Sequence, residues 1–138
     1  MSLNKAFEDV KKFHITFEHP VAEVPKVMEE ERKKARTAWM QEELDEFVEA
    51  KTIEDEVDAM IDLMYFALGT LVEIGVKPQE IFDIVQHANM SKVWPDGLVH
   101  KNEMGKTIKP ENWEDPAPKI RAEIERQINE AIAKKENK

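Results

Sequence analysis

The spacing of glycine and proline constrains this fold more than any other feature of the sequence. Residues 26–68 contain neither, and the stretches 1–19, 79–94 and 119–138 are also free of both. Helix interiors tolerate these residues poorly, and each of these stretches is rich in helix-forming residues. No segment alternates apolar and polar residues over a long run, as a half-buried strand would. The sequence therefore predicts an all-α bundle of about five helices in a single domain, residues 1–138.

Local signals place the ends of these helices. The residue before a proline avoids the helical region, so the first helix should end just before Pro20. Thr52 is a plausible N-cap for the third helix, and Gly75 a plausible stop. Pro78 suits the start of the fourth helix. The expected helices cover about residues 3–17, 26–50, 53–74, 78–93 and 117–134, with a loop over residues 94–115.

Composition excludes several classes of function. Of 138 residues, 36% are charged, 41% are hydrophobic and none is cysteine, which excludes thiolate metal sites, disulfides and a cysteine nucleophile. The net charge of −9 makes duplex nucleic acid and anionic membrane unexpected partners, because both favour basic surfaces. The longest near-apolar run, residues 63–72, falls well short of the about 20 residues that a membrane span needs. The N-terminus lacks the apolar core of a signal peptide, so the expected compartment is the cytoplasm.

Acidic residues at helical spacing mark a candidate metal site. They are Glu42, Glu43, Asp45 and Glu46 in the second expected helix and Asp55, Asp58 and Asp62 in the third. The third helix is otherwise apolar almost all round, which is typical of a buried helix. Unpaired carboxylates are costly to bury, and no basic residue lies between Lys51 and Lys77 to balance them. A short turn at Thr52 favours an antiparallel hairpin, whose carboxylates would suit Mg²⁺ or Mn²⁺.

Acidic residues in such helices can also have purely structural roles. A glutamate run in so acidic a chain is usually a solvated face, and the helix dipole favours acids such as Asp55 and Asp58 at a helix start. Neither role accounts for Asp62, two turns inside the helix. A di-iron bundle would need an acidic residue three positions before a histidine, and none of the four histidines has one.

These motifs resemble those of the all-α NTP pyrophosphohydrolase superfamily, which includes MazG-like enzymes, dimeric dUTPases and phosphoribosyl-ATP pyrophosphohydrolases. Residues 42–46 match its EExxE motif, and the helix from residue 55 is similar to its ExxD helix. As in the MazG-like branch, an Asn-x-Ser-Lys helix end follows at 89–92, and a Gly-Lys-x-x-Lys-Pro-x-x-Trp segment at 105–113. The similarity covers about residues 5–115.

One departure affects the candidate ligands. Ala59 stands where the glutamate of ExxD is usual, three residues before Asp62. Either Asp55 or Asp58 could join Asp62 at the site, and Asp58 is favoured.

The resemblance implies a MazG-like helical fold and hydrolysis of a nucleoside triphosphate between its α and β phosphates. Mg²⁺, or alternatively Mn²⁺, would neutralise the polyanionic substrate and lower the pKa of a bound water. The implied metal ligands are Glu43, Glu46, Asp58 and Asp62. Glu42 is the implied residue that orients or deprotonates the water. The candidate substrate contacts are Asn89, Lys92, Lys106 and Lys109, although ordinary surface lysines are an alternative for the last three.

Several further expectations follow from the same resemblance. The preferred substrate would be dUTP or another pyrimidine deoxynucleotide, and the assembly a homodimer or homotetramer. Trp39 is expected in the core rather than on the base, while His14 and Phe17 are weaker candidates for a base pocket. The alternatives are a phosphoribosyl-ATP pyrophosphohydrolase and, in another class, a non-enzymatic acidic helical binding module.

Overall fold

The structure is a computed structural model that describes residues 2–137, and it confirms the all-α prediction. Its helices are α1 (Ser2–Thr16), α2 (Glu30–Glu49), α3 (Ile53–Ile74), α4 (Gln79–Met90) and α5 (Ala117–Glu136). Within the described residues there is no strand, and the only β-type pairing is an isolated antiparallel bridge between Lys101 and Thr107 in the loop before α5.

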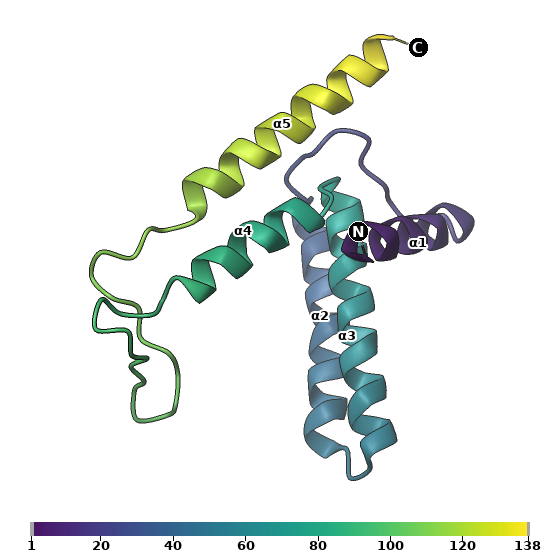
Figure 1. Cartoon of the computed structure of the whole chain (residues 1–138). Coiled ribbons are helices and arrows are strands. Elements are labelled where there is room, and N and C mark those ends of the chain that lie inside the picture. Colours follow the sequence, from purple (N-terminus) through teal and green to yellow (C-terminus); the bar gives the residue numbers. More distant parts are fainter. Residues whose placement is uncertain (1, 138) are drawn as a thin grey trace.

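Helices α2 and α3 form a long antiparallel hairpin joined by residues 50–52 (Figure 1). The predicted cap is present, because the Thr52 hydroxyl accepts a hydrogen bond from the Asp55 backbone N–H at 3.1 Å. Gly75 ends α3 in the left-handed region at φ +87°, which glycine adopts without strain. Helix α1 crosses α3 near this end and also contacts α4, and α4 and α5 run antiparallel beside each other (Figure 1).

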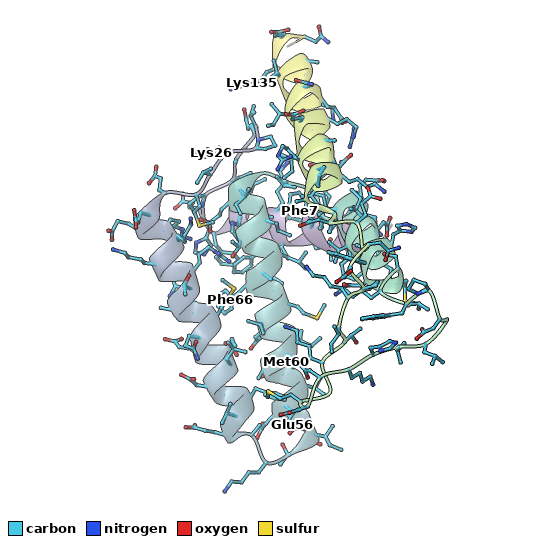
Figure 2. The ribbon with its side chains drawn as sticks, turned by 90° about the vertical axis from the view of Figure 1, so that its left-hand side faces the viewer. Phe7, Lys26, Glu56, Met60, Phe66 and Lys135 are labelled. Atoms are coloured by element: carbon cyan, nitrogen blue, oxygen red, sulfur yellow. The ribbon has the colours of Figure 1, made fainter. Side chains whose placement is uncertain are left out.

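The apolar core lies where α1 crosses the C-terminal half of α3. Phe7, Val10 and Val72 are almost completely buried there, with Leu68 and Leu71 packed against them. Figure 2 shows Phe7 at this end of the hairpin, whereas Glu56 lies near the opposite, free end.

A buried ionic network lies beside this core and ties α2 to α3. Glu73 on α3 accepts hydrogen bonds from Arg32 (2.7 and 3.0 Å) and from Arg36, both on α2. Arg36 also donates to the Phe66 carbonyl at 3.0 Å. Burying these charges is tolerable because each finds partners of opposite charge or hydrogen-bond acceptors.

The prediction that α2 begins at residue 26 is wrong, since the helix begins at Glu30. Residues 26–29 are extended, with Glu29 at φ −61° and ψ 145°. The backbone N–H groups of Ala22 and Lys26 donate to the Val72 and Ile74 carbonyls at the end of α3, and this holds the linker outside a helix. The stretch 26–68, which contains no glycine or proline, is therefore not helical throughout.

Two other ends also differ from the prediction. Helix α4 ends at Met90 rather than near residue 93, because residues 91–92 turn away, and α5 continues to Glu136 rather than ending near residue 134. No single helix within residues 2–137 is long and apolar enough to cross a bilayer. Only α3 and α4 taken together, as a pair bent by 118°, reach that length and composition.

The N-terminal half of α3, which the sequence predicts to be buried, is not covered within this single chain. Ile53, Val57, Ile61 and Met64 each expose half or more of their surface, and Leu44, Phe47 and Val48 of α2 are also exposed. Neither α4 nor α5 packs against α2 or α3. The free half of the hairpin is therefore uncovered.

Candidate active site

The register of the α2–α3 hairpin places its acidic residues opposite one another. The rings of Trp39 on α2 and Phe66 on α3 lie 6.0 Å apart. Because the helices are antiparallel, the turns after Trp39 face the turns before Phe66. The structure thereby brings together the four carboxylates expected as metal ligands: Glu43, Glu46, Asp58 and Asp62.

The pKa values of two of these groups reflect this crowding. Burial raises the pKa of Glu43 to about 7, with further contributions from a hydrogen bond with Glu46 and the negative charges of Glu46, Asp62 and Asp58. Burial and the charges of Asp58 and Glu46 also raise the pKa of Asp62. The Oε2 atom of Glu43 is buried and has no hydrogen-bond partner. The site thus concentrates negative charge around an unsatisfied oxygen.

No basic side chain neutralises this cluster. Within residues 2–137, none of the four carboxylates has a Lys, Arg or His nitrogen within 4.0 Å. In the same part of the chain, no three Asp, Glu or His side chains converge as a ready-made metal site. The donor set nevertheless fits a divalent cation, because all its members are hard oxygen donors and one oxygen lacks a partner. Glu46 and Asp58 are both exposed to solvent.

Asp55, Asp45 and Glu42 are not among the charges that raise the pKa values of Glu43 and Asp62. The Asp55 backbone takes part in the N-cap of α3, and its carboxylate does not contribute to the raised pKa of Glu43. Asp45 is exposed and accepts a hydrogen bond from Gln41 at 2.9 Å. Glu42 is also exposed, one position before Glu43. Of the two aspartates left open by the sequence, the structure places Asp58 with the cluster.

An aromatic cluster lies one turn beyond Asp62. The Tyr65 ring meets Phe13 of α1 edge to face at 5.6 Å, and Phe13 lies 4.7 Å from Phe17 and 5.8 Å from His19. Phe13, Phe17 and Tyr65 are each more than one third exposed. Of these residues only Phe17 is a candidate for a base pocket from the sequence, because Phe13 and His19 come from a part of the chain distant from Tyr65.

Trp39, which is expected in the core, and His14, one of the two weaker candidates for a base pocket, both have structural surroundings. Trp39 packs on Phe66 and lies under the guanidinium groups of Arg32 and Arg36, 5.1 and 5.6 Å from its ring centroid. His14 is buried, with Nδ1 2.9 Å from the Pro20 carbonyl oxygen. Both side chains therefore belong to the packed end of the hairpin.

The expected substrate contacts lie away from the carboxylates within this chain. Lys92 and Lys109 lie 5.5 and 5.0 Å from the ring centroid of Trp113, whose Nε1–H donates to the Ala88 carbonyl of α4. Asn89 and Lys106 are exposed on α4 and on the loop. In Figure 1 this loop lies well to one side of the α2–α3 hairpin. The structure gathers Lys92 and Lys109 around Trp113 but does not bring them to the acidic cluster.

Comparisons with known proteins agree with this architecture. Residues 10–89, more than half of the chain, match the sequence profile of the phosphoribosyl-ATP pyrophosphohydrolase family (PRA-PH). Among the solved structures, 23 chains match significantly, and one is a protein from Exiguobacterium sp. 255-15 that was proposed to be an NTP pyrophosphohydrolase. That crystal structure is 30% identical, with a TM-score of 0.51, over 91% of this chain and 96% of its own. No protein of curated function matches the chain at a significant level.

Proposed function

Because the chain belongs to the phosphoribosyl-ATP pyrophosphohydrolase family, within the all-α NTP pyrophosphohydrolase superfamily, we propose that it hydrolyses nucleoside triphosphates to a monophosphate and pyrophosphate. The chain is a hydrolase of pyrophosphate bonds. We also propose its metal ion, its preferred substrate and the roles of individual residues. Its preferred substrate is dUTP or another pyrimidine deoxynucleotide.

One observation carries this proposal: four carboxylates meet across two helices, and among residues 2–137 no basic side chain pairs with them and Oε2 of Glu43 has no hydrogen-bond partner. A divalent cation, Mg²⁺ or Mn²⁺, would satisfy that oxygen and offset the mutual repulsion. Glu43, Glu46, Asp58 and Asp62 would hold it. When bound there, the cation would neutralise phosphate oxygens and polarise them.

The chain's own residues would carry the remaining steps. Glu42, exposed beside the cluster, would orient a water molecule and accept its proton as the water oxygen attacks the α phosphorus. The bond from that phosphorus to the bridging oxygen then breaks, and the electron pair leaves with pyrophosphate. The aromatic cluster around Tyr65 would offer a stacking surface to the base, one helical turn from the carboxylates.

The phosphate contacts would come from the loop segment. Asn89, Lys92, Lys106 and Lys109 lie away from the carboxylates of their own chain, so they would act on the site of a neighbouring copy. A homodimer or homotetramer would bring the two together, and the uncovered apolar half of the hairpin offers a surface for it. The proposed compartment is the cytoplasm.

A panel of nucleoside and deoxynucleoside triphosphates with pyrophosphate detection tests the activity. With Mg²⁺ we expect equal amounts of monophosphate and pyrophosphate, and loss of activity with a chelator. In ¹⁸O-labelled water the label should enter the monophosphate. Orthophosphate and a nucleoside diphosphate as first products would reject the proposal, and label only in pyrophosphate would locate the attack at the β phosphate.

Phosphoribosyl-ATP is a second candidate substrate, because the matching family carries its name. The lysine-rich loop with Trp113 argues for a MazG-like enzyme instead. Including phosphoribosyl-ATP in the same panel discriminates between the two. A turnover of that compound far above that of every simple triphosphate would favour the second candidate.

A further inference from the structure

A cavity of about 420 Å³ lies between α1 and α5, at the opposite end of the hairpin from the acidic cluster. Its apolar floor includes Phe7, Val21 and Val72. Phe7 and Val72 also belong to the main core, and each is at most 4% exposed. Phe7 and Val72 therefore form the closed base of the cavity, and the half-buried Val21 beside them keeps apolar surface open to a ligand.

Helix α5 roofs the cavity and is anchored on both sides of it. The Gln127 side chain accepts from the Lys77 backbone N–H at 2.8 Å and donates to the Lys77 carbonyl at 3.1 Å. Farther along α5, Lys135 pairs with Glu23 of the linker at 3.9 Å. The space between these anchors is therefore built by the fold.

The walls carry more positive than negative charge. Five basic side chains and three acidic ones line the cavity. The basic residues are Lys11, Lys77, Arg126, Lys134 and Lys135, and the acidic residues are Glu23, Glu80 and Glu130. Two further acids just outside the lining also pair with these bases: Glu8 with Lys77, and Glu123 with Arg126.

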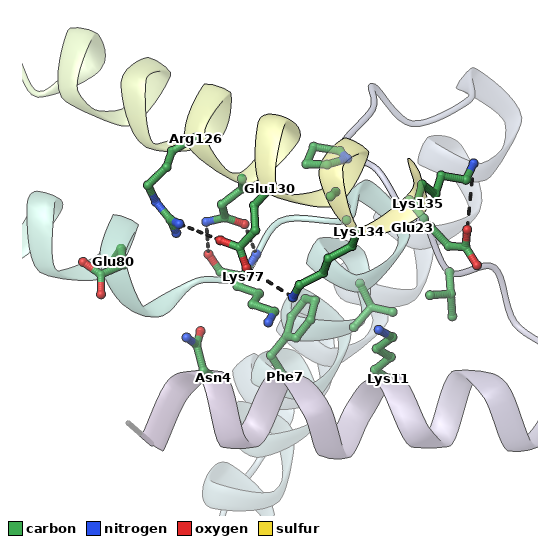
Figure 3. A pocket seen from close by; sticks show the side chains of 17 residues that line it. Asn4, Phe7, Lys11, Glu23, Lys77, Glu80, Arg126, Glu130, Lys134 and Lys135 are labelled. Atoms are coloured by element: carbon green, nitrogen blue, oxygen red, sulfur yellow. Dashed lines mark hydrogen bonds and ion pairs between the residues drawn. The ribbon is translucent and has the colours of Figure 1, made fainter. Parts of the chain in front are cut away.

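Three of these lysines come from different elements and are incompletely paired. In Figure 3 Lys11, Lys77 and Lys134 point into the space between α1 and α5. Lys11 is half-buried, and within residues 2–137 no carboxylate lies within 4.0 Å of its amine. Lys77 reaches only Glu8, at 4.0 Å, and Lys134 shares Glu130 with Arg126.

We propose that this cavity is a second ligand site, distinct from the acidic cluster, for a phosphate monoester attached to a compact apolar or aromatic body. The phosphate lies among Lys11, Lys77 and Lys134, and the body packs on the floor around Phe7. A phosphate monoester carries a charge of about −2 near neutral pH and three acceptor oxygens, one for each of these lysines. A single carboxylate has only two oxygens.

Calorimetric titration of the full chain in a chelator tests this proposal without depending on hydrolysis. The first ligand, adenosine monophosphate, carries both the phosphate and the aromatic body. Adenosine carries the body alone, and inorganic phosphate is the phosphate alone. We expect saturable binding of one adenosine monophosphate per chain, at least about tenfold tighter than either fragment, because both parts contribute. No saturable binding, or adenosine binding as tightly as its monophosphate, would overturn the proposal.

Variants locate the site. Combining Lys11→Met with Lys134→Met should weaken adenosine monophosphate binding by about tenfold or more, since two charge-assisted contacts are lost. The matched control is Lys12→Met, an exposed lysine on the same helix that does not line the cavity, and it should bind as the wild type does. Asp62→Asn should also leave binding unchanged, even if the protein proves to hydrolyse no triphosphate. Equal weakening by Lys12→Met, or loss of binding in Asp62→Asn, would contradict the assignment.

Discussion

At the scale of single residues, the pKa values of two glutamates, Glu73 and Glu43, shift in opposite directions. Burial alone would raise the pKa of Glu73, but hydrogen bonds from Arg32 and the charges of Arg36 and Arg32 lower it below its usual value. Glu43 has only other acids around it, and its pKa rises to about 7. The charge of Glu73 is therefore balanced within the fold, whereas burial and the neighbouring acids both oppose the charged form of Glu43.

Asp62→Asn should remove metal-dependent hydrolysis and leave the helical fold intact. The amide keeps the shape of the side chain but lacks the charge that binds a cation. It should also relieve repulsion among the four carboxylates when no divalent cation is added. Circular dichroism checks the fold, and pyrophosphate release checks the activity. Activity above about a tenth of wild type, which corresponds to a barrier raised by less than about 1.4 kcal/mol, would show that Asp62 is not a ligand.

His14→Asn should flatten the dependence of stability on pH in the mildly acidic range. Burial and the charge of Arg36 lower the pKa of His14 below 6.5, although the hydrogen bond with the Pro20 carbonyl opposes this. His14 is therefore uncharged near neutral pH, and its 4.0 Å contact with Glu73 is not an ion pair there. A lowered folded-state pKa contributes stability that is present above 6.5 and is lost as the pH falls toward the folded value. Asparagine keeps a donor and does not titrate.

Urea unfolding at pH 7.5 and 5.5 measures this effect. The wild type should lose more stability than His14→Asn between the two values, although the variant is less stable at both. Replacing the exposed His87 by asparagine should leave the wild-type dependence in place. A variant that loses as much stability as the wild type would show that His14 does not carry the effect.

The sequence predicted the acidic cluster but not the network that supports it. Asp62 stood out because an acid two turns inside an apolar helix is costly to bury without a cation, and helical spacing related it to Asp58. Arg36 and Glu73 lie 37 positions apart, and only the register of the folded hairpin pairs them. Local patterns contain no information about such a pairing.

At the scale of the elements, Gly69 allows three helices to approach closely. A Cβ atom built there would lie 2.5 Å from Arg36 Nη2 of α2 and 2.8 Å from His14 Nε2 of α1. The sequence presented this glycine only as an interruption of an apolar helix. Its role depends on where α1 crosses α3, and the periodicity of either helix alone cannot fix that crossing.

Gly69→Ala should therefore destabilise the protein although alanine is the better helix former. Overpacking costs about 1–3 kcal/mol, against a gain of at most about 1 kcal/mol in helix propensity. The reverse change at the exposed Ala67, to glycine, measures the propensity effect alone on the same helix. Chemical denaturation compares the two, and a more stable Gly69→Ala variant would show that Arg36 and His14 can move aside at little cost.

At the scale of the whole molecule, the apolar surface exceeds what five helices cover. The exposed residues of the free hairpin half follow helical spacing along α3, so they form one stripe rather than scattered contacts. A stripe of this kind marks an interaction surface. The sequence predicted that the surface would be buried, and within one chain it is not.

We expect a homo-oligomer in solution, a dimer at least, held in part by this stripe. Ile61→Lys, in the centre of the stripe and 53% exposed, should lower the mass measured by light scattering. The control is Val27→Lys, 84% exposed in the linker before α2, which should leave the mass unchanged. A monomeric mass for the wild type at micromolar concentration would rule out the oligomer.

The uneven covering of the hairpin also sets how its backbone opens. Amide protons near Glu73 lie beside the core and the ionic network, so their exchange with deuterium requires much of the molecule to unfold. Amides around residues 50–58 have no other element over them, and they should exchange through fraying of the hairpin end alone. Ligands or a second copy that bind this end would close such openings, so slower exchange there would report binding before any chemistry occurs.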